Sequence, residues 1–146
     1  MGKRTLGLKW NNNYSVGVEE IDKQHKNLFT IINNTVEIIS NLSKNSDKGE
    51  GERQLNEIIT SLLEYKKIHF ETEEKYFKEF NFEGAQDHIA KHQEFSNKLT
   101  KLKEEAGGDI IAFSFIIVDF LEDWLVDHLM TLDQEYKECF KRHGLK

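Results

Sequence analysis

The 146-residue sequence contains no proline and only one cysteine, Cys139. Because proline interrupts helices and favours turns, its absence favours long uninterrupted helices over a turn-rich β fold. With a single cysteine, no intrachain disulfide can form, which favours a reducing, cytoplasmic setting. The shortage of thiolates also excludes iron–sulfur clusters and cysteine-ligated zinc sites.

Long apolar runs and long basic runs are missing as well. No stretch approaches the roughly 20 apolar residues that span a bilayer, and the N-terminus lacks the apolar run of a signal peptide. The formal net charge is −6, which argues against nucleic acid and anionic membranes as partners. We therefore expect a cytoplasmic protein with no nucleic-acid or membrane partner.

Four segments with helical periodicity make up most of the chain, and their length suits one domain, 1–146. Polar, glycine-bearing breaks at 43–51, 81–84 and 106–109 separate predicted helices at about 19–42, 52–80, 85–105 and 110–141, after an N-terminal arm, 1–18. Asp109 is a plausible N-cap, and Trp10 and Tyr14 are possible anchors of the arm. Short connections predict an all-α, antiparallel up-down-up-down four-helix bundle.

Each predicted helix directs at least one histidine into its apolar stripe. A lone histidine on such a face is usually a core residue, but i, i+4 pairs lie on one helix face. In an antiparallel bundle, at about 1.5 Å of rise per residue, all the candidates fall in one slab near one end. These candidates are His25, His69, Glu73, His88, His92, His128 and Asp133. His143, near the C-terminus, is interpreted as a surface residue.

His128 and Asp133 are five residues apart, which places them roughly 140° apart around a regular α-helix. Glu135 is nearly in line with His128, but two turns separate them by roughly 10 Å along the axis. A π-type turn through 128–133 would bring Asp133 inward, whereas a regular α-helical ladder would exclude this. The spacing alone leaves both acids open.

Five inward imidazoles and two carboxylates need partners, and a metal centre provides them. Imidazole with carboxylate suits iron, manganese or zinc, and this many ligands suits two ions rather than one. Five imidazoles, two bridging carboxylates and one bridging oxide or hydroxide fill all but one position of two six-coordinate ions. A redox-active pair with one open position suits a small diatomic ligand.

Four motifs closely resemble the hemerythrins, particularly the single-domain bacterial ones. They are SVGVEEIDKQH (15–25), HFETEE (69–74), HIAKH (88–92) and WLVDHLMTLD (124–133). They occur in order, and the resemblance covers essentially the whole chain. It implies reversible dioxygen binding, rather than enzymatic turnover, at a non-haem centre of two iron ions with an oxo or hydroxo bridge.

The resemblance also implies a role for each candidate residue. His88, His92 and His128 would hold the saturated iron, His25 and His69 the iron with the open position, and Glu73 and Asp133 would bridge the two. Trp124, Leu129 and Met130 would help line the oxygen pocket, although core packing explains them equally well. Single-domain bacterial relatives suggest a monomer, and no protein partner is indicated.

Other chemistry on the same bundle fits the sequence less well. Ferritin-like di-iron enzymes carry Glu-x-x-His on two helices, and this chain has none. The HExxH motif of zinc proteases is also absent. An oxygen or redox sensor, or a protein that reacts with peroxide or nitric oxide at the same iron pair, remains an open alternative.

Overall fold

The computed structural model describes residues 9–44, 48–105 and 110–146, and these are almost entirely helical, with no strand among them. A short 3-10 helix, η2 (Asn12–Tyr14), precedes α1 (Glu19–Lys44), α2 (Lys48–Glu79), α3 (Ala85–Glu105) and α4 (Ile110–Trp124). The chain continues through the π-helix η3 (Leu125–Leu132), α5 (Asp133–Glu135) and α6 (Lys137–Arg142). The predicted cap Asp109 lies outside the described residues.

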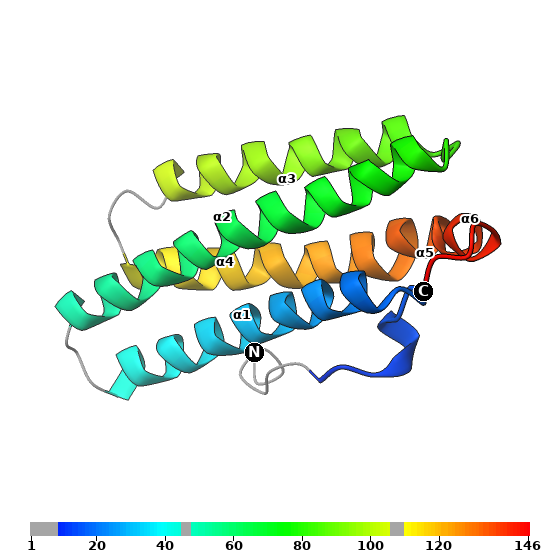
Figure 1. Ribbon diagram of the computed structural model, residues 1–146. Coiled ribbons are helices and arrows are strands. Elements are labelled where there is room, and N and C mark those ends of the chain that lie inside the picture. Colours follow the sequence, from blue (N-terminus) through cyan, green and yellow to red (C-terminus); the bar gives the residue numbers. More distant parts are fainter. Residues whose placement is uncertain (1–8, 45–47, 106–109) are drawn as a thin grey trace.

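The four long helices lie side by side, and each runs opposite to the one before it (Figure 1). α1 packs against α2 and α4, and α3 packs against the same two helices. This arrangement confirms the predicted all-α bundle with up-down-up-down order. Within the described part of the chain, no helix is both long enough and apolar enough to span a membrane.

The first predicted break is longer than the structure allows. α1 continues to Lys44 and α2 already begins at Lys48, so Gly49 and Gly51 lie inside a helix. Glycine is unfavourable in a helix because it loses more backbone entropy than other residues. Gly51 is buried, however, so packing offsets this cost where the sequence predicted a loop.

The second break ends α2 with a specific hydrogen-bonded motif. Asn81 adopts a left-handed conformation with φ of 52°. The amide of Phe82 donates to the carbonyl of Phe77 at 2.9 Å, and the amide of Asn81 donates to that of Lys78 at 3.4 Å. This is a Schellman cap, and its usual apolar contact is present between Phe77 and Phe82. It turns the chain into α3.

The described part of the arm is held against α1. Trp10 and Tyr14 pack on Phe29, with ring centroids 5.5 Å and 4.8 Å away, which confirms them as anchors. The carboxylate of Asp22 accepts hydrogen bonds from the hydroxyl of Ser15 at 2.6 Å and from an arm amide at 2.9 Å. The arm therefore covers α1 near its first turns.

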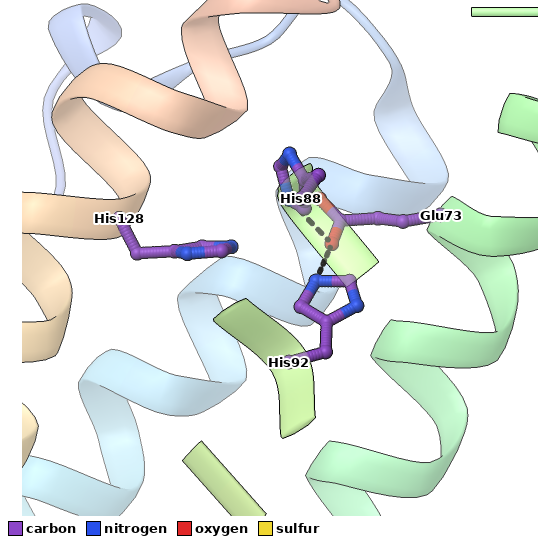
Figure 2. Close-up of side chains that lie close together, drawn as sticks. All are labelled: Glu73, His88, His92 and His128. Atoms are coloured by element: carbon purple, nitrogen blue, oxygen red, sulfur yellow. Dashed lines mark ion pairs between the residues drawn. The ribbon is translucent and has the colours of Figure 1, made fainter. Parts of the chain in front are cut away.

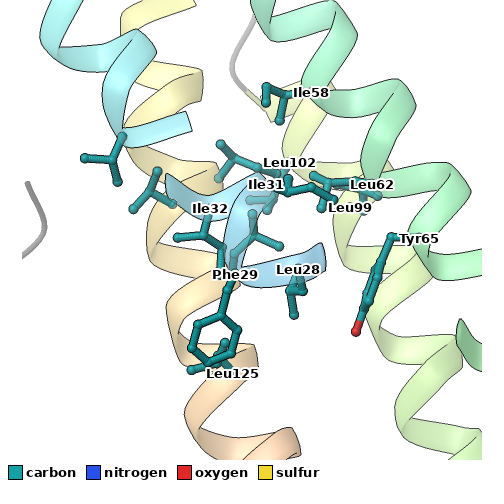
Figure 3. Packing of buried hydrophobic residues seen from close by; sticks show 14 of the residues in the cluster. Leu28, Phe29, Ile31, Ile32, Ile58, Leu62, Tyr65, Leu99, Leu102 and Leu125 are labelled. Carbon is teal, nitrogen blue, oxygen red and sulfur yellow. The ribbon is translucent and has the colours of Figure 1, made fainter. Parts of the chain in front are cut away.

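Two apolar clusters form the core, and the candidate ligands lie between them. Figure 3 shows part of the larger cluster, which includes Leu28 from α1, Leu62 from α2, Leu99 from α3 and Leu125 from η3. The smaller cluster contains Val16, Val18, Ile21, Phe77, Tyr136, Cys139 and Phe140. The polar slab predicted near one end of the bundle is thus enclosed by apolar packing on both sides.

Candidate metal centre

All seven predicted ligands converge in the bundle interior, and each is at most 3 % exposed. They come from α1, α2, α3, η3 and α5. Their ligand atoms form two groups, each within 4.8 Å of one another: one contains Glu73, His88, His92 and His128, and the other contains His25, His69, Glu73 and Asp133. Because Glu73 belongs to both, the two groups adjoin.

The first group contains three histidines, drawn in Figure 2 around Glu73. Oε1 of Glu73 lies 2.9 Å from Nε2 of His92 and 3.5 Å from Nε2 of His88. Oδ1 of Asp133 lies 2.9 Å from Nε2 of His88 and 3.0 Å from Nε2 of His128. Both carboxylates therefore reach the three-histidine group.

The second group contains only two histidines. Nε2 of His25 and Nε2 of His69 are 3.0 Å apart. Oδ2 of Asp133 lies 3.0 Å from the first, and Oε1 of Glu73 lies 3.3 Å from the second. Asp133 thus presents one oxygen to each group, which is the arrangement of a bridging carboxylate.

The atoms that face this space fit metal ions. Among the described residues, several inward nitrogens and oxygens are buried without a hydrogen-bond partner, including Glu73 Oε1, His88 Nε2, His92 Nε2, His128 Nε2 and both oxygens of Asp133. Buried polar atoms are rarely left in this state, and unpaired clusters of them point to a missing ion. Imidazole and carboxylate together suit iron, manganese or zinc.

The π-helix explains how two residues five apart reach the same site. The backbone amide of Asp133 donates to the carbonyl of His128, an i→i+5 bond that places the two residues one wide turn apart. This confirms the predicted π-type turn, which extends over Leu125–Leu132. Glu135, the other acid that the spacing left open, is exposed and lies outside the site.

The imidazoles around the two carboxylates lower the pKa of both acids. Burial raises the pKa of Glu73, but the imidazoles of His69, His88 and His92 outweigh this effect and hold that pKa well below its usual range. Burial and the charge of Glu73 raise the pKa of Asp133, but the imidazoles of His128 and His25 lower it by more. The net result is a pKa below the usual range of an aspartate. Both acids are therefore ionised, as metal ligands must be.

The pKa values of two ligand imidazoles shift in opposite directions. Burial lowers the pKa of His88, but Asp133 and Glu73 raise it to about 9. Burial is the largest influence on His69 and lowers its pKa despite the nearby Glu73. Without metal, the three-histidine group thus carries a proton that a metal ion would have to displace.

Three polar side chains that sequence reasoning missed orient the ligands from outside. The amide oxygen of Gln24 lies 2.8 Å from Nδ1 of His69, and the carboxylate of Glu74 lies 2.9 Å from Nδ1 of His92. The hydroxyl of Tyr136 donates to Oε2 of Glu73. Such outer partners fix the ring orientation of a metal ligand. Their only signal in the sequence is that Gln24 and Glu74 adjoin ligand residues.

Aromatic rings cover the imidazoles of both groups. Phe70 stacks on His92 with centroids 3.7 Å apart, and Trp124 stacks on His128 at 3.9 Å. Tyr65 stacks on His69 at 5.1 Å with an interplanar angle of 16°. Tyr65 and Phe70 were not singled out in the sequence, because buried aromatics on a helix face resemble ordinary core residues.

The predicted pocket residues have different environments. Trp124 stacks on a ligand, and Leu129 is fully buried in the larger cluster, while their place in an oxygen pocket stays a prediction. The prediction for Met130 is wrong, because its side chain is 38 % exposed on the outside of η3. The prediction for His143 is confirmed, since it is exposed and stacks on Phe80.

Comparison with known proteins agrees with this geometry. Residues 16–140 match the hemerythrin HHE cation binding domain. The chain is 27 % identical to a bacteriohemerythrin of Clostridium acetobutylicum over 87 % of this chain and 96 % of the relative. It is 27 % identical to a hemerythrin-like protein of Naegleria gruberi over 89 % and 91 %.

A myohemerythrin of Sipunculus nudus is 26 % identical, with 88 % of this chain and 89 % of the relative covered. The family match spans most of the chain, from the arm to α6, and includes every residue of the two ligand groups. The chain therefore belongs to the hemerythrin family.

Proposed function

We propose that the chain binds dioxygen reversibly at two iron ions held by the seven converging side chains and bridged by an oxide or hydroxide. The observation that carries this proposal is the inequality of the two groups. Three histidines face one position and two face the other, while Glu73 and Asp133 reach both. With a bridging oxygen, one six-coordinate ion is complete and the other has one open position.

Iron is the metal that best combines this donor set with the proposed activity. Zinc accepts the same ligands but has no redox chemistry. An iron pair, when bound, supplies the two electrons that dioxygen accepts. Imidazole-rich coordination and the match to hemerythrin relatives support this choice over a carboxylate-rich oxygenase site.

The chain's own residues would hold and enclose the metals. The ligands are fixed from outside by Gln24, Glu74 and Tyr136, and apolar clusters on both sides exclude water. Seven protein ligands leave room for only a small molecule. We therefore propose a binding protein for oxygen storage, delivery or scavenging, rather than an enzyme.

We further propose that the protein works in the cytoplasm as a monomer. A buried, unpaired Cys139 supports a reducing setting. The large apolar side chains that are exposed among the described residues are Leu63, Ile68, Phe115 and Met130. Scattered exposed apolar residues are normal on monomers and do not demand a partner.

The test is an oxygen-dependent absorption spectrum. Protein reduced to the ferrous state should develop a visible charge-transfer band in air, and the band should fade under argon over repeated cycles. Metal analysis should find two irons per chain. Zinc, or one metal per chain, would contradict the di-iron proposal. Irreversible conversion to the ferric state would contradict reversible binding and favour a sensor or a peroxide- or nitric-oxide-reacting protein.

A further inference from the structure

Two buried tyrosines lie beside the metal centre, and only one has its hydroxyl satisfied. Tyr136 is fully buried and donates to Glu73. Tyr65 is 2 % exposed, and its hydroxyl has no hydrogen-bond partner among the described residues. Leaving a buried hydroxyl unpaired is unfavourable. The hydroxyl of Tyr65 therefore requires an acceptor that the described residues do not supply.

The position of Tyr65 identifies the side of the centre that it faces. It lies one helical turn before His69 on α2, and its ring stacks on that imidazole at 5.1 Å. Figure 3 shows its hydroxyl pointing away from Ile58 and Leu62, toward the end of the bundle that holds the ligands. Tyr65 thus covers the two-histidine group, where the open position is proposed.

The charges around Tyr65 agree with this placement. Burial raises the pKa of the Tyr65 phenol well above its usual value, and the carboxylates of Asp133 and Glu73 raise it further. The phenol therefore keeps its hydrogen at neutral pH and can act as a donor.

A second unpaired donor lies beside the first. The indole Nε1 of Trp124, on α4, is also buried without a hydrogen-bond partner among the described residues, and this side chain lies close enough to Tyr65 to lower the pKa of its phenol. An indole N–H can only donate, whereas a phenol can both accept and donate. If Trp124 occupies the acceptor side of the phenol, the phenol hydrogen remains available for a ligand.

A cavity adjoins Tyr65 on its outer side. It has a volume of about 180 Å³ and lies between α1 and α2. Its lining residues are Gln24, Asn27, Ser61, Glu64, Tyr65 and Ile68. Tyr65 thus contacts both this cavity and the imidazole of His69.

We propose that Tyr65, supported by Trp124, donates a hydrogen bond to a small anionic ligand at the open position beside His69, and so favours anions over neutral ligands there. This inference rests on the proposed function, because it needs the open iron position. It adds to that function a polar donor in an otherwise apolar enclosure. Tyr65 acts here as a specificity-determining residue, in its neutral form.

Azide tests the proposal because it is a small anion with no exchangeable hydrogen. The azide stretching band of the oxidised, iron-loaded protein is recorded in H₂O and in D₂O. A shift between the two solvents is expected in the wild-type protein, since the Tyr65 hydroxyl exchanges its hydrogen. No shift would overturn the proposal without needing any variant.

Tyr65→Phe keeps the ring on His69 and removes only the hydroxyl. We expect loss of the isotope shift and azide binding weakened about tenfold or more, because hydrogen bonds to charged groups are the strong ones. Tyr14→Phe, a change in the arm, is the matched control and should alter neither. Trp124→Phe should weaken azide binding less than Tyr65→Phe does.

The failures are distinguishable. A Tyr65→Phe protein that holds two irons, binds azide within about twofold of wild type and keeps the shift would overturn the role of Tyr65 and assign the shift to a bound water. A wild-type protein that lacks two irons, or that binds neither azide nor dioxygen, would overturn the proposed function itself.

Discussion

The two ligand groups share both carboxylates but differ in everything around them. The three-histidine group is covered by Phe70 and Trp124, whose rings lie nearly parallel to imidazoles at 3.7 Å and 3.9 Å. The two-histidine group is covered by Tyr65, at 5.1 Å and with an unpaired hydroxyl. A cavity adjoins each side, one of about 400 Å³ at Phe70 and His92 and one of about 180 Å³ at Tyr65, so the difference lies in the covering rings.

The comparison shows how one bundle brings together two unequal groups of candidate ligands. Two histidines of α3, spaced i, i+4, lie on one helix face and both belong to the three-histidine group. No such pair faces the other side, where His25 and His69 come from different helices. Unequal numbers of histidines, rather than unequal carboxylates, would leave the proposed open position on the two-histidine side.

Removing a shared carboxylate should have the largest effect on iron binding, because it should affect both ligand groups at once. Asp133 presents one oxygen to each group, so Asp133→Ala should lower iron from two per chain towards none. Iron analysis of the purified variant measures this. Circular dichroism should still show a helical protein, and retention of both irons would contradict a bridging role.

Removing one histidine from either group should cause unequal losses of iron, depending on the group that is changed. His25→Ala leaves a single imidazole in its group, so we expect iron to fall to about one per chain and the oxygen-dependent band to vanish. His128→Ala leaves two imidazoles and should lose less iron. Iron analysis of both variants in parallel decides, and equal losses would contradict unequal groups.

The outer partners should give smaller, side-specific effects. Gln24→Ala removes the hydrogen bond to Nδ1 of His69, and Glu74→Ala removes the one to Nδ1 of His92. Each variant should therefore bind iron about tenfold to a hundredfold more weakly in its own ligand group. Competition with a chelator measures this. Glu71→Ala, an exposed change on the same helix as Glu74, is the matched control. An effect of Glu71 equal to that of Glu74 would show that surface charge alone acts.

Proton binding should separate the two groups in the metal-free protein. His88 has its pKa raised to about 9, so its contribution to stability is fully present below its ordinary value and is lost as pH rises through 9. Glu73 and Asp133 have lowered pKa values, so their contribution is lost as pH falls below the ordinary carboxyl range.

Denaturant unfolding of chelator-treated protein across this pH range checks both limbs. Iron requires neutral imidazoles, so the loss of stability at alkaline pH should disappear in the iron-loaded protein. A metal-free protein whose stability is flat from pH 6 to 10 would contradict the proton on His88.

The sequence predicted the bundle and the convergence of the ligands well, because both follow from helix period and order. Four segments with inward histidines at matching heights leave few arrangements. The spacing alone left Asp133 and Glu135 open, and the resemblance to hemerythrins selected Asp133. A π-type turn was then predictable, since no regular helix brings residues five apart to one site. The start of α2 was not, because the burial of Gly51 depends on its neighbours in space.

The surroundings of the site were less predictable. Met130 follows Leu129 in sequence, and because neighbouring residues of a helix point in different directions, one is buried and the other lies at the surface. Tyr65 lies four residues before His69, a spacing that now relates it to the centre. What a sequence cannot show is which buried hydroxyl lacks a partner, since that depends on side chains from other helices.

The most direct test of the account is the stoichiometry of iron and dioxygen on one sample. Reduced protein is exposed to a measured volume of oxygen, and uptake, release under argon and iron content are recorded together. We predict two irons and one dioxygen per chain, with the gas recovered on release. One metal per chain, two dioxygens per chain, or oxygen consumed without recovery would contradict two unequal positions with a single opening.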